Sequence, residues 1–196
     1  KHSFTSNNST VAEGLFINNM NNGTGNNASL IFSNDSGERK KASISYIDTG
    51  AYGTGDMVFA LDADANSGEL HVTNDERMRI VKDGQVRIGN PNNLALWGQN
   101  NRLQVAGTDW NTSGITIACM SNSGSANLIL GNSRASTPGG SGSALLANDR
   151  LAYISFVGDD GTDMNTVGAA IVAELDSNAS SNSMPARLRF YTGGNS

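Results

Sequence analysis

The residue types that most often carry enzyme or metal chemistry are scarce in this chain of 196 residues. Histidine occurs only as His2 and His71, and cysteine only as Cys119. Zinc sites and disulfide frameworks need more of these side chains than the chain supplies. A Ser-His-Asp triad would have to use His71, which lies in an expected strand, 70–73, so a structural or surface role is favoured. We therefore predict no catalytic residue, no metal site and no cofactor.

Carboxylates are more numerous, and one loop groups several of them. Residues 62–69, Asp-Ala-Asp-Ala-Asn-Ser-Gly-Glu, have the outline of a calcium loop. Ser67 stands where an EF-hand requires glycine, and Thr73 stands where it requires a bidentate glutamate, so a solvated turn is favoured. Glycoside cleavage by two carboxylates stays open, because nothing in the sequence indicates which of the 18 acidic residues would pair.

Aromatic rings in polar loops are the candidates for ligand binding, because sugars commonly stack on such rings. Trp97, Trp110 and Tyr52 lie in polar loop sequence and are our predicted ligand-binding residues. For the two tryptophans, burial at a subunit axis or between units is the alternative. The phenylalanines at expected strand positions are assigned instead to the core: Phe32, Phe59, Phe156 and Phe190.

Composition excludes several classes of partner and points to an oligomer. Thirteen basic residues against 18 acidic ones give a net charge of −5, which argues against nucleic-acid binding. No run approaches the roughly 18 apolar residues of a membrane span, so no membrane insertion is expected. Asn, Ser and Gly are abundant, whereas large aliphatic residues are few. A chain of this kind folds most easily when it shares a core with copies of itself.

The elements that position these residues are expected to be strands. Short runs with apolar and polar residues in alternation predict strands at 15–17, 29–32, 42–47, 56–61, 77–81, 85–88 and 153–157. The alanine-rich run 167–175 also contains Ile171 and Val172, which favour a strand over a helix. Asp83-Gly84 predicts a type I′ hairpin turn in which both residues have positive φ. We therefore expect an all-β fold.

An internal repeat suggests how the strands are organised. Five pairs of segments match in the same order: 14–20 with 114–120, 28–34 with 126–132, 44–46 with 154–156, 58–60 with 171–173, and 70–73 with 188–192. This spacing predicts two tandem β-domains, 1–73 and 114–196, joined by a connecting hairpin segment, 74–113. The second copy ends where an equivalent of 76–80 would begin, so we expect the polypeptide to continue past Ser196.

Two segments resemble the repeats of a known family. Residues 76–80, Glu-Arg-Met-Arg-Ile, followed by Asp-Gly-Gln-Val-Arg-Ile-Gly at 83–89, resemble a segment common in bacteriophage tail fibres and tailspikes. In that family the segment often precedes an intramolecular chaperone domain of the endosialidase type. That domain, with its catalytic Ser and Lys, is not in this sequence. Segments 126–131 and 186–192 resemble the same fibre repeats.

The resemblance implies a fold, a location and a role. It implies an elongated, intertwined homotrimer, similar to a β-helix or β-prism, whose strands pack around a threefold axis. Such a fibre is extracellular, sits on the virion with other tail proteins, and contacts a host-cell surface glycan or an outer-membrane receptor without being an enzyme. The segment could be the binding region or a passive shaft. A polysaccharide-depolymerising tailspike and a bacterial surface adhesin with β-repeats stay open as alternatives.

Overall fold

The computed structural model describes residues 17–21, 23–33, 39–140 and 142–193. These residues contain nine strands, one 3-10 turn and no α-helix, which confirms the expected all-β class. The chain divides into two compact units. The first comprises residues 1–94 and 101–115, and the second comprises residues 95–100 and 116–196.

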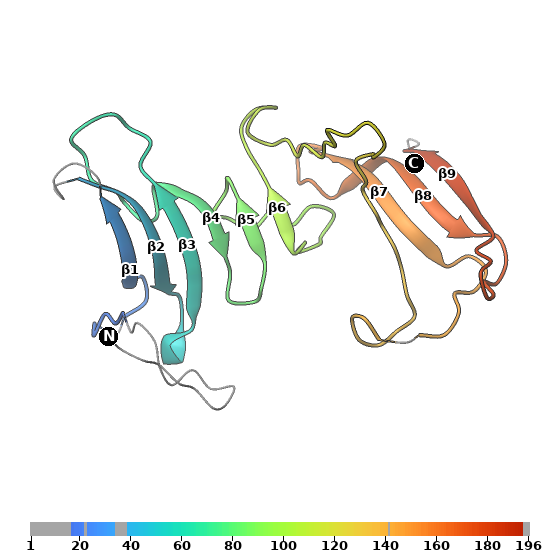
Figure 1. The fold of residues 1–196 in the computed structure, drawn as a ribbon, viewed down its shortest axis with the longest axis horizontal. Coiled ribbons are helices and arrows are strands. Elements are labelled where there is room, and N and C mark those ends of the chain that lie inside the picture. Colours follow the sequence, from blue (N-terminus) through green and yellow to red (C-terminus); the bar gives the residue numbers. More distant parts are fainter. Residues whose placement is uncertain (1–16, 22, 34–38, 141, 194–196) are drawn as a thin grey trace. The chain divides into compact units, whose positions relative to one another are not determined.

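The first unit is built on one six-stranded sheet (Figure 1). Its strands follow one another in chain order: β1 (Asn27–Ser33), β2 (Lys40–Asp48), β3 (Gly55–Leu61), β4 (Glu76–Ile80), β5 (Val86–Ile88) and β6 (Leu103–Val105). All neighbours are antiparallel except β5 and β6, which are parallel. The 3-10 turn η1 (Ala51–Gly53) connects β2 to β3. Strands β4 to β6, which come from segment 74–113, continue this sheet.

The second unit contains a three-stranded antiparallel sheet. Its strands are β7 (Arg150–Gly158), β8 (Thr166–Leu175) and β9 (Ala186–Thr192), in that order. Strand β8 confirms the prediction for 167–175, because β-branched residues favour the pleated sheet over a helix. Apart from 15–17, which lies mostly outside the described residues, the predicted strands of both units coincide closely with β1 to β5 and β7.

The matched segments occupy partly equivalent places. Segments 44–46 and 154–156 lie in β2 and β7, the first strands of the antiparallel meanders β2–β3–β4 and β7–β8–β9. Segment 188–192 lies in β9, which pairs with β8 as β4 pairs with β3. The expected strand at 70–73 is wrong, because the carbonyl of His71 accepts the amides of Asn74 and Asp75 and closes a turn.

The hairpin between β4 and β5 uses a different turn from the one expected. The amide of Gly84 donates to the carbonyl of Val81 (2.7 Å), and the amide of Val81 donates to the carbonyl of Gln85 (2.8 Å). Gly84 has a φ of 86°, but Asp83 does not adopt a positive φ. The type I′ assignment is therefore wrong. The loop has three residues with one glycine in the left-handed region, which is the next most common way to join two strands.

Replacing Gly84 with alanine is expected to lower the free energy of unfolding by about 1–2 kcal/mol, because the left-handed conformation costs that much for a residue with a Cβ. The added Cβ would also lie 3.0 Å from Nη1 of Arg102. Chemical denaturation measures the loss. Lys82→Ala, an exposed control in the same loop, should change stability by less than about 0.5 kcal/mol. Equal effects of the two substitutions would contradict the turn assignment.

Candidate functional site

The first sheet leaves its apolar face open to solvent. Paired residues of neighbouring strands share a face, and successive residues alternate between faces. The register therefore places three rows of side chains on one face, all of them apolar or tyrosine: Ala28, Tyr46, Met57, Ile80, Val86 and Leu103; Leu30, Ile44, Phe59, Met78, Ile88 and Val105; and Phe32, Ala42 and Leu61. None of these residues is buried within the described structure. We call these rows the first open face.

The opposite face of the same sheet is covered, although much of it is polar. Leu70 and Val72, from the connection between β3 and β4, pack against Ile47, Val58 and Ala60. Beside this small core, the hydroxyls of Ser43 and Ser45 in β2 are buried and lie 2.9 Å apart. The covered face thus buries hydroxyls beside its small apolar core, and the other face leaves aliphatic side chains open, whereas an ordinary one-sided antiparallel sheet turns its polar face to water.

A charged cluster lies on the covered face. Arg79 in β4 donates from Nη1 to Oδ2 of Asp56 (2.7 Å) and from Nη2 to Oε2 of Glu76 (2.5 Å). The three side chains are only 13, 8 and 3% exposed. The hydrogen bond to Glu76 raises the pKa of Arg79 above its ordinary value, burial opposes this rise, and Asp56 adds to it. Each buried charge thus has a partner, which is the condition for tolerating charge in a sheet interior.

An amide network extends the covered face under β5 and β6. Nε2 of Gln85 and Nε2 of Gln104 both donate to Oδ1 of Asn93, at 3.0 and 2.9 Å. Gln85 also donates to the carbonyl of Asn101, and Oε1 of Gln104 accepts the amide of Leu94. Among the described residues, no buried side-chain nitrogen or oxygen lacks a hydrogen-bond partner. The polar interior of this unit is therefore fully satisfied.

The second unit repeats this layout. The register of its sheet places three rows of side chains on one face, and Thr192 is the single polar member of these rows. The rows are Ala152, Ala173 and Leu188; Ile154, Ile171 and Phe190; and Phe156, Ala169 and Thr192. We call these residues the second open face, which exposes Phe156 (53%) and Phe190 (74%). On the other face Ala170, Val172 and Glu174 are buried.

The phenylalanines are therefore misassigned by the sequence analysis. Phe32, Phe59, Phe156 and Phe190 lie on the two open faces and not in a core of the single chain. Their spacing correctly identifies the apolar side of each strand. What it cannot identify is whether the chain itself covers that side.

A further apolar segment is unpaired. Residues 116–132 form no strand, although 126–132 matches the sequence of β1. Ile117, Met120, Leu128 and Ile129 expose half or more of their surface. Apolar, extended and unpaired backbone of this kind is suited to pairing with another chain.

The three predicted ligand-binding aromatics do not form a cluster within either unit. Tyr52 lies in η1 with a φ of 58° and is fully exposed, and Trp110 is 84% exposed in a loop of the first unit. Trp97 belongs to the second unit and is 42% exposed.

Trp97 is held in a defined position by a tight turn. Trp97 and Gly98 have φ values of 54° and 66°, and the amide of Gln99 donates to the carbonyl of Leu96, which is the pattern of a type I′ turn. The amide of Trp97 donates to the carbonyl of Met164 (3.1 Å). Its indole ring stacks on Tyr153, with 5.3 Å between ring centroids and 21° between planes.

Tyr153 lines a hollow that sequence reasoning missed. The hollow, of about 200 Å³, is lined by Arg150, Tyr153, Val167, Ala169, Tyr191, Thr192 and Gly193. The guanidinium carbon of Arg150 lies 5.3 Å from the centroid of the Tyr153 ring, and that of Arg189 lies 4.6 Å from the centroid of Tyr191. No local sequence signal groups these residues, because they come from β7, β8 and β9.

A larger hollow, of about 530 Å³, lies in the first unit. Its lining is mainly asparagine, at 18, 19, 21, 26 and 27, together with Tyr46 and Asp48. Two of these amides are engaged within the chain: Asn19 donates to the carbonyl of Asn27, and Asn26 donates to that of Gly23. This hollow contains no cationic side chain and no stacked pair of rings.

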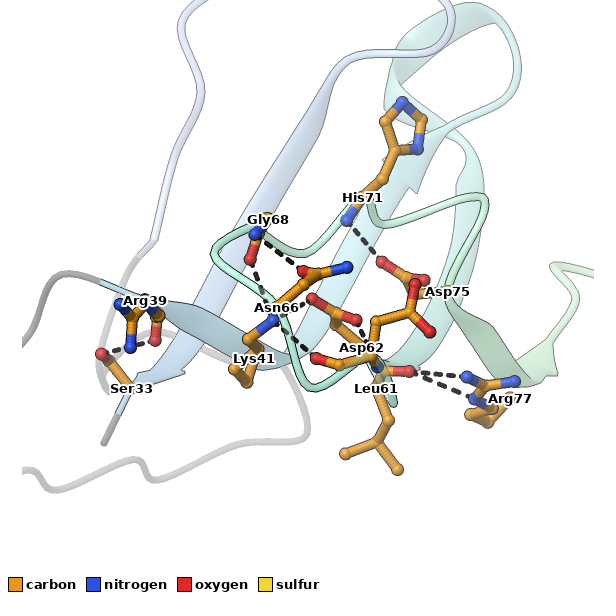
Figure 2. Close-up of polar contacts among 11 residues, drawn as sticks. Ser33, Arg39, Lys41, Leu61, Asp62, Asn66, Gly68, His71, Asp75 and Arg77 are labelled. Atoms are coloured by element: carbon orange, nitrogen blue, oxygen red, sulfur yellow. Dashed lines mark hydrogen bonds and ion pairs between the residues drawn. The ribbon is translucent and has the colours of Figure 1, made fainter. Parts of the chain in front are cut away.

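The acidic loop 62–69 surrounds a lysine ammonium. Nζ of Lys41 donates to Oδ2 of Asp62 (2.5 Å) and to the carbonyl of Gly68 (2.9 Å), as Figure 2 shows. It also donates to the carbonyl of Asp64 (3.1 Å). The hydrogen bond from Lys41 lowers the pKa of Asp62 below its ordinary value. The loop oxygens that suggested calcium thus already hold a cation of the chain itself. In the described part of the chain, no group of three or more His, Cys, Asp or Glu side chains is arranged to hold a metal ion.

Ion pairs also order the ends of the second sheet. Oε1 of Glu174 accepts hydrogen bonds from Arg189 (2.7 Å) and Arg187 (2.5 Å), and these bonds lower the pKa of Glu174. Asp149 accepts two hydrogen bonds from Arg134 and one from the amide of Leu146. These hydrogen bonds, chiefly those from Arg134, lower the pKa of Asp149 to about 2.

Comparisons with other proteins add no identification: the sequence matches no protein-family model and no curated protein. Among the described residues, no helix is long and apolar enough to cross a membrane.

Acid is expected to destabilise the second unit through Asp149. Its pKa is about 2 in the folded chain and near 3.9 when unfolded, so its contribution is complete above about pH 4 and is lost as the pH falls towards 2. Denaturation midpoints measured from pH 5 to 2.5 should fall less steeply for Asp149→Asn than for the wild type. Parallel curves would contradict this assignment.

Proposed function

We propose that this chain is a segment of a homotrimeric virion tail fibre that attaches the particle to the host-cell surface. The observation that carries the proposal is the exposure of apolar rows on one face of the sheet in both units, while the other face buries a small apolar core together with charged side chains. Fully burying one Leu, Ile or Phe side chain contributes about 1.5–3 kcal/mol, so two such faces leave a large stabilisation unused in a single chain. Exposed contiguous apolar patches mark interaction surfaces.

A second copy is the occupant that fits best. Neither open face carries a charge that a partner of opposite sign would have to match. Another copy of the chain carries the same two apolar faces. Identical subunits aligned in parallel can therefore cover both open faces of one another. The number three comes from the resemblance of 76–80 and 83–89 to trimeric tail fibres. In such a trimer the open faces would meet around the axis as the sides of a prism.

The tandem organisation is part of the same proposal. The meanders β2–β3–β4 and β7–β8–β9 both place apolar rows on one side and a carboxylate–arginine cluster on the other. Two successive β-domains of this kind would lengthen a fibre along its axis. Three equivalent weak receptor sites per fibre would then raise the overall affinity through effective concentration, which is the proposed mechanism of attachment to a glycan or outer-membrane receptor.

Binding to host cells tests the proposed function. Fluorescently labelled protein should bind intact cells of the host, and an excess of unlabelled protein should block adsorption of the virus. Periodate treatment of the cells, which destroys vicinal diols, separates a glycan receptor from a protein receptor. Absence of binding and of competition would contradict an attachment role and leave a passive shaft. Release of reducing ends from host polysaccharide would instead indicate a depolymerising tailspike.

Charge placed on the open faces should prevent assembly. Phe59→Asp and Phe190→Asp would each bury a carboxylate in an apolar interface, at a cost of several kcal/mol per ion. Both substitutions should dissociate the trimer at micromolar concentrations, as measured by sedimentation velocity. Tyr52→Asp is the matched control, because it adds the same charge at a fully exposed aromatic position outside the open faces. Trimers that persist in both face variants would contradict the proposed interface.

A further inference from the structure

We propose that the hollow between Tyr153 and Tyr191 binds a single sugar residue that carries a carboxylate, with Arg150 as its anion-binding side chain. This inference rests on the proposed attachment function for the choice of a saccharide. The hollow itself is a feature of the second unit, and two of its lining residues, Ala169 and Thr192, also belong to the second open face.

Arg150 forms no salt bridge among the described residues, although Glu174 lies opposite it in the register of β7 and β8. Arg187 and Arg189, the other arginines of this sheet, are held by Glu174 at 2.5 and 2.7 Å. Arg134, at the margin of the same unit, is held by Asp149. Among the described residues, Arg150 has no carboxylate partner, and its side chain contacts the ring of Tyr153. A guanidinium that no carboxylate of the chain holds can bind the planar carboxylate of a ligand in a bidentate manner.

The tyrosines beside Arg150 can contact a sugar through their hydroxyls. Tyr153, which packs against Trp97 and Arg150, and Tyr191, which packs against Arg189, both line the hollow, and their hydroxyls can exchange hydrogen bonds with sugar hydroxyls. Trp97 stacks on Tyr153 and is itself fixed by its turn and by the bond to Met164, so the ring of Tyr153 is held before any ligand arrives. Preorganised rings lower the entropic cost of binding.

The size of the hollow limits the ligand. Its volume of about 200 Å³ is below the roughly 300–1,000 Å³ of pockets for drug-sized molecules. One sugar residue, at the end of a chain or as a side branch, fits this volume better than several residues of a polysaccharide. Weak binding to one sugar is consistent with the multivalent mechanism proposed above.

The test compares methyl glucuronide with methyl glucoside, which differ by the carboxylate alone. Binding to the full chain is followed by tryptophan fluorescence in a Trp110→Phe background, in which Trp97 is the sole tryptophan, and by ligand-observed NMR. The glucuronide should bind at least about tenfold more tightly than the glucoside, because a hydrogen-bonded charge pair is gained. Sodium acetate at the same concentrations should bind more weakly than the glucuronide, because it lacks the pyranose ring.

Variants assign the effect to Arg150. Arg150→Gln should abolish the preference for the glucuronide, and Arg150→Lys should retain only part of it, because an ammonium lacks the bidentate geometry. Lys82→Gln, which removes one exposed positive charge from the other unit, is the matched control and should bind as the parent does. Any of four results would overturn the inference: equal binding of the two sugars, tighter binding of acetate than of the glucuronide, no binding of the glucuronide, or an unchanged preference for the glucuronide in Arg150→Gln. The native mass and cell binding of the same sample show separately whether the proposed function stands.

Discussion

The exposure of apolar side chains along one side of each sheet is the constraint on which the rest of the molecule depends. In the first unit two cross-strand rows of apolar residues and one tyrosine run from β1 to β6 and a third runs from β1 to β3, and in the second unit a similar face runs from β7 to β9. Contiguous exposed apolar faces of this kind mark interaction surfaces. In the proposed trimer the strands would form one wall of a core that several chains complete.

The covered side explains why the sheets keep their register without a large apolar core. In the first unit Arg79 links β3 and β4 through Asp56 and Glu76, and in the second unit Glu174 links β8 and β9 through Arg187 and Arg189. A shift of one residue along the strand would move each charge to the apolar side. These clusters consequently specify pairing, while in the proposed trimer burial between chains would supply most of the stability. The arginine in each cluster comes from the third strand of its meander.

Much of the secondary structure could be predicted from the sequence, because alternation of apolar and polar residues is a local signal. The predictions that were wrong depend on non-local contacts. Phe32, Phe59, Phe156 and Phe190 were placed in the core because alternation identifies the apolar side but not what covers it. The segment 70–73 looked like a strand, yet backbone bonds to the carbonyl of His71 close it into a turn. Asp83-Gly84 was correctly placed in a hairpin, but the loop has three residues and one positive φ.

The candidate site was predictable only in part. Trp97 was selected for its polar loop, but its partner Tyr153 lies far along the chain, and the loop that anchors the tryptophan includes Asn165. Arg150 and Tyr191 carry no motif, and they become a group only through the pairing of β7, β8 and β9. Tyr52 and Trp110 stand alone as exposed rings in the described structure.

The most direct test of the central claim is the native mass of the unmodified chain in dilute buffer, measured by light scattering coupled to size exclusion. A homotrimer has three times the chain mass of 20.5 kDa, and this is the result that the open faces and the fibre resemblance predict. A folded, monodisperse species of 20.5 kDa would contradict the account, because the two apolar faces would then be stable in water without a partner.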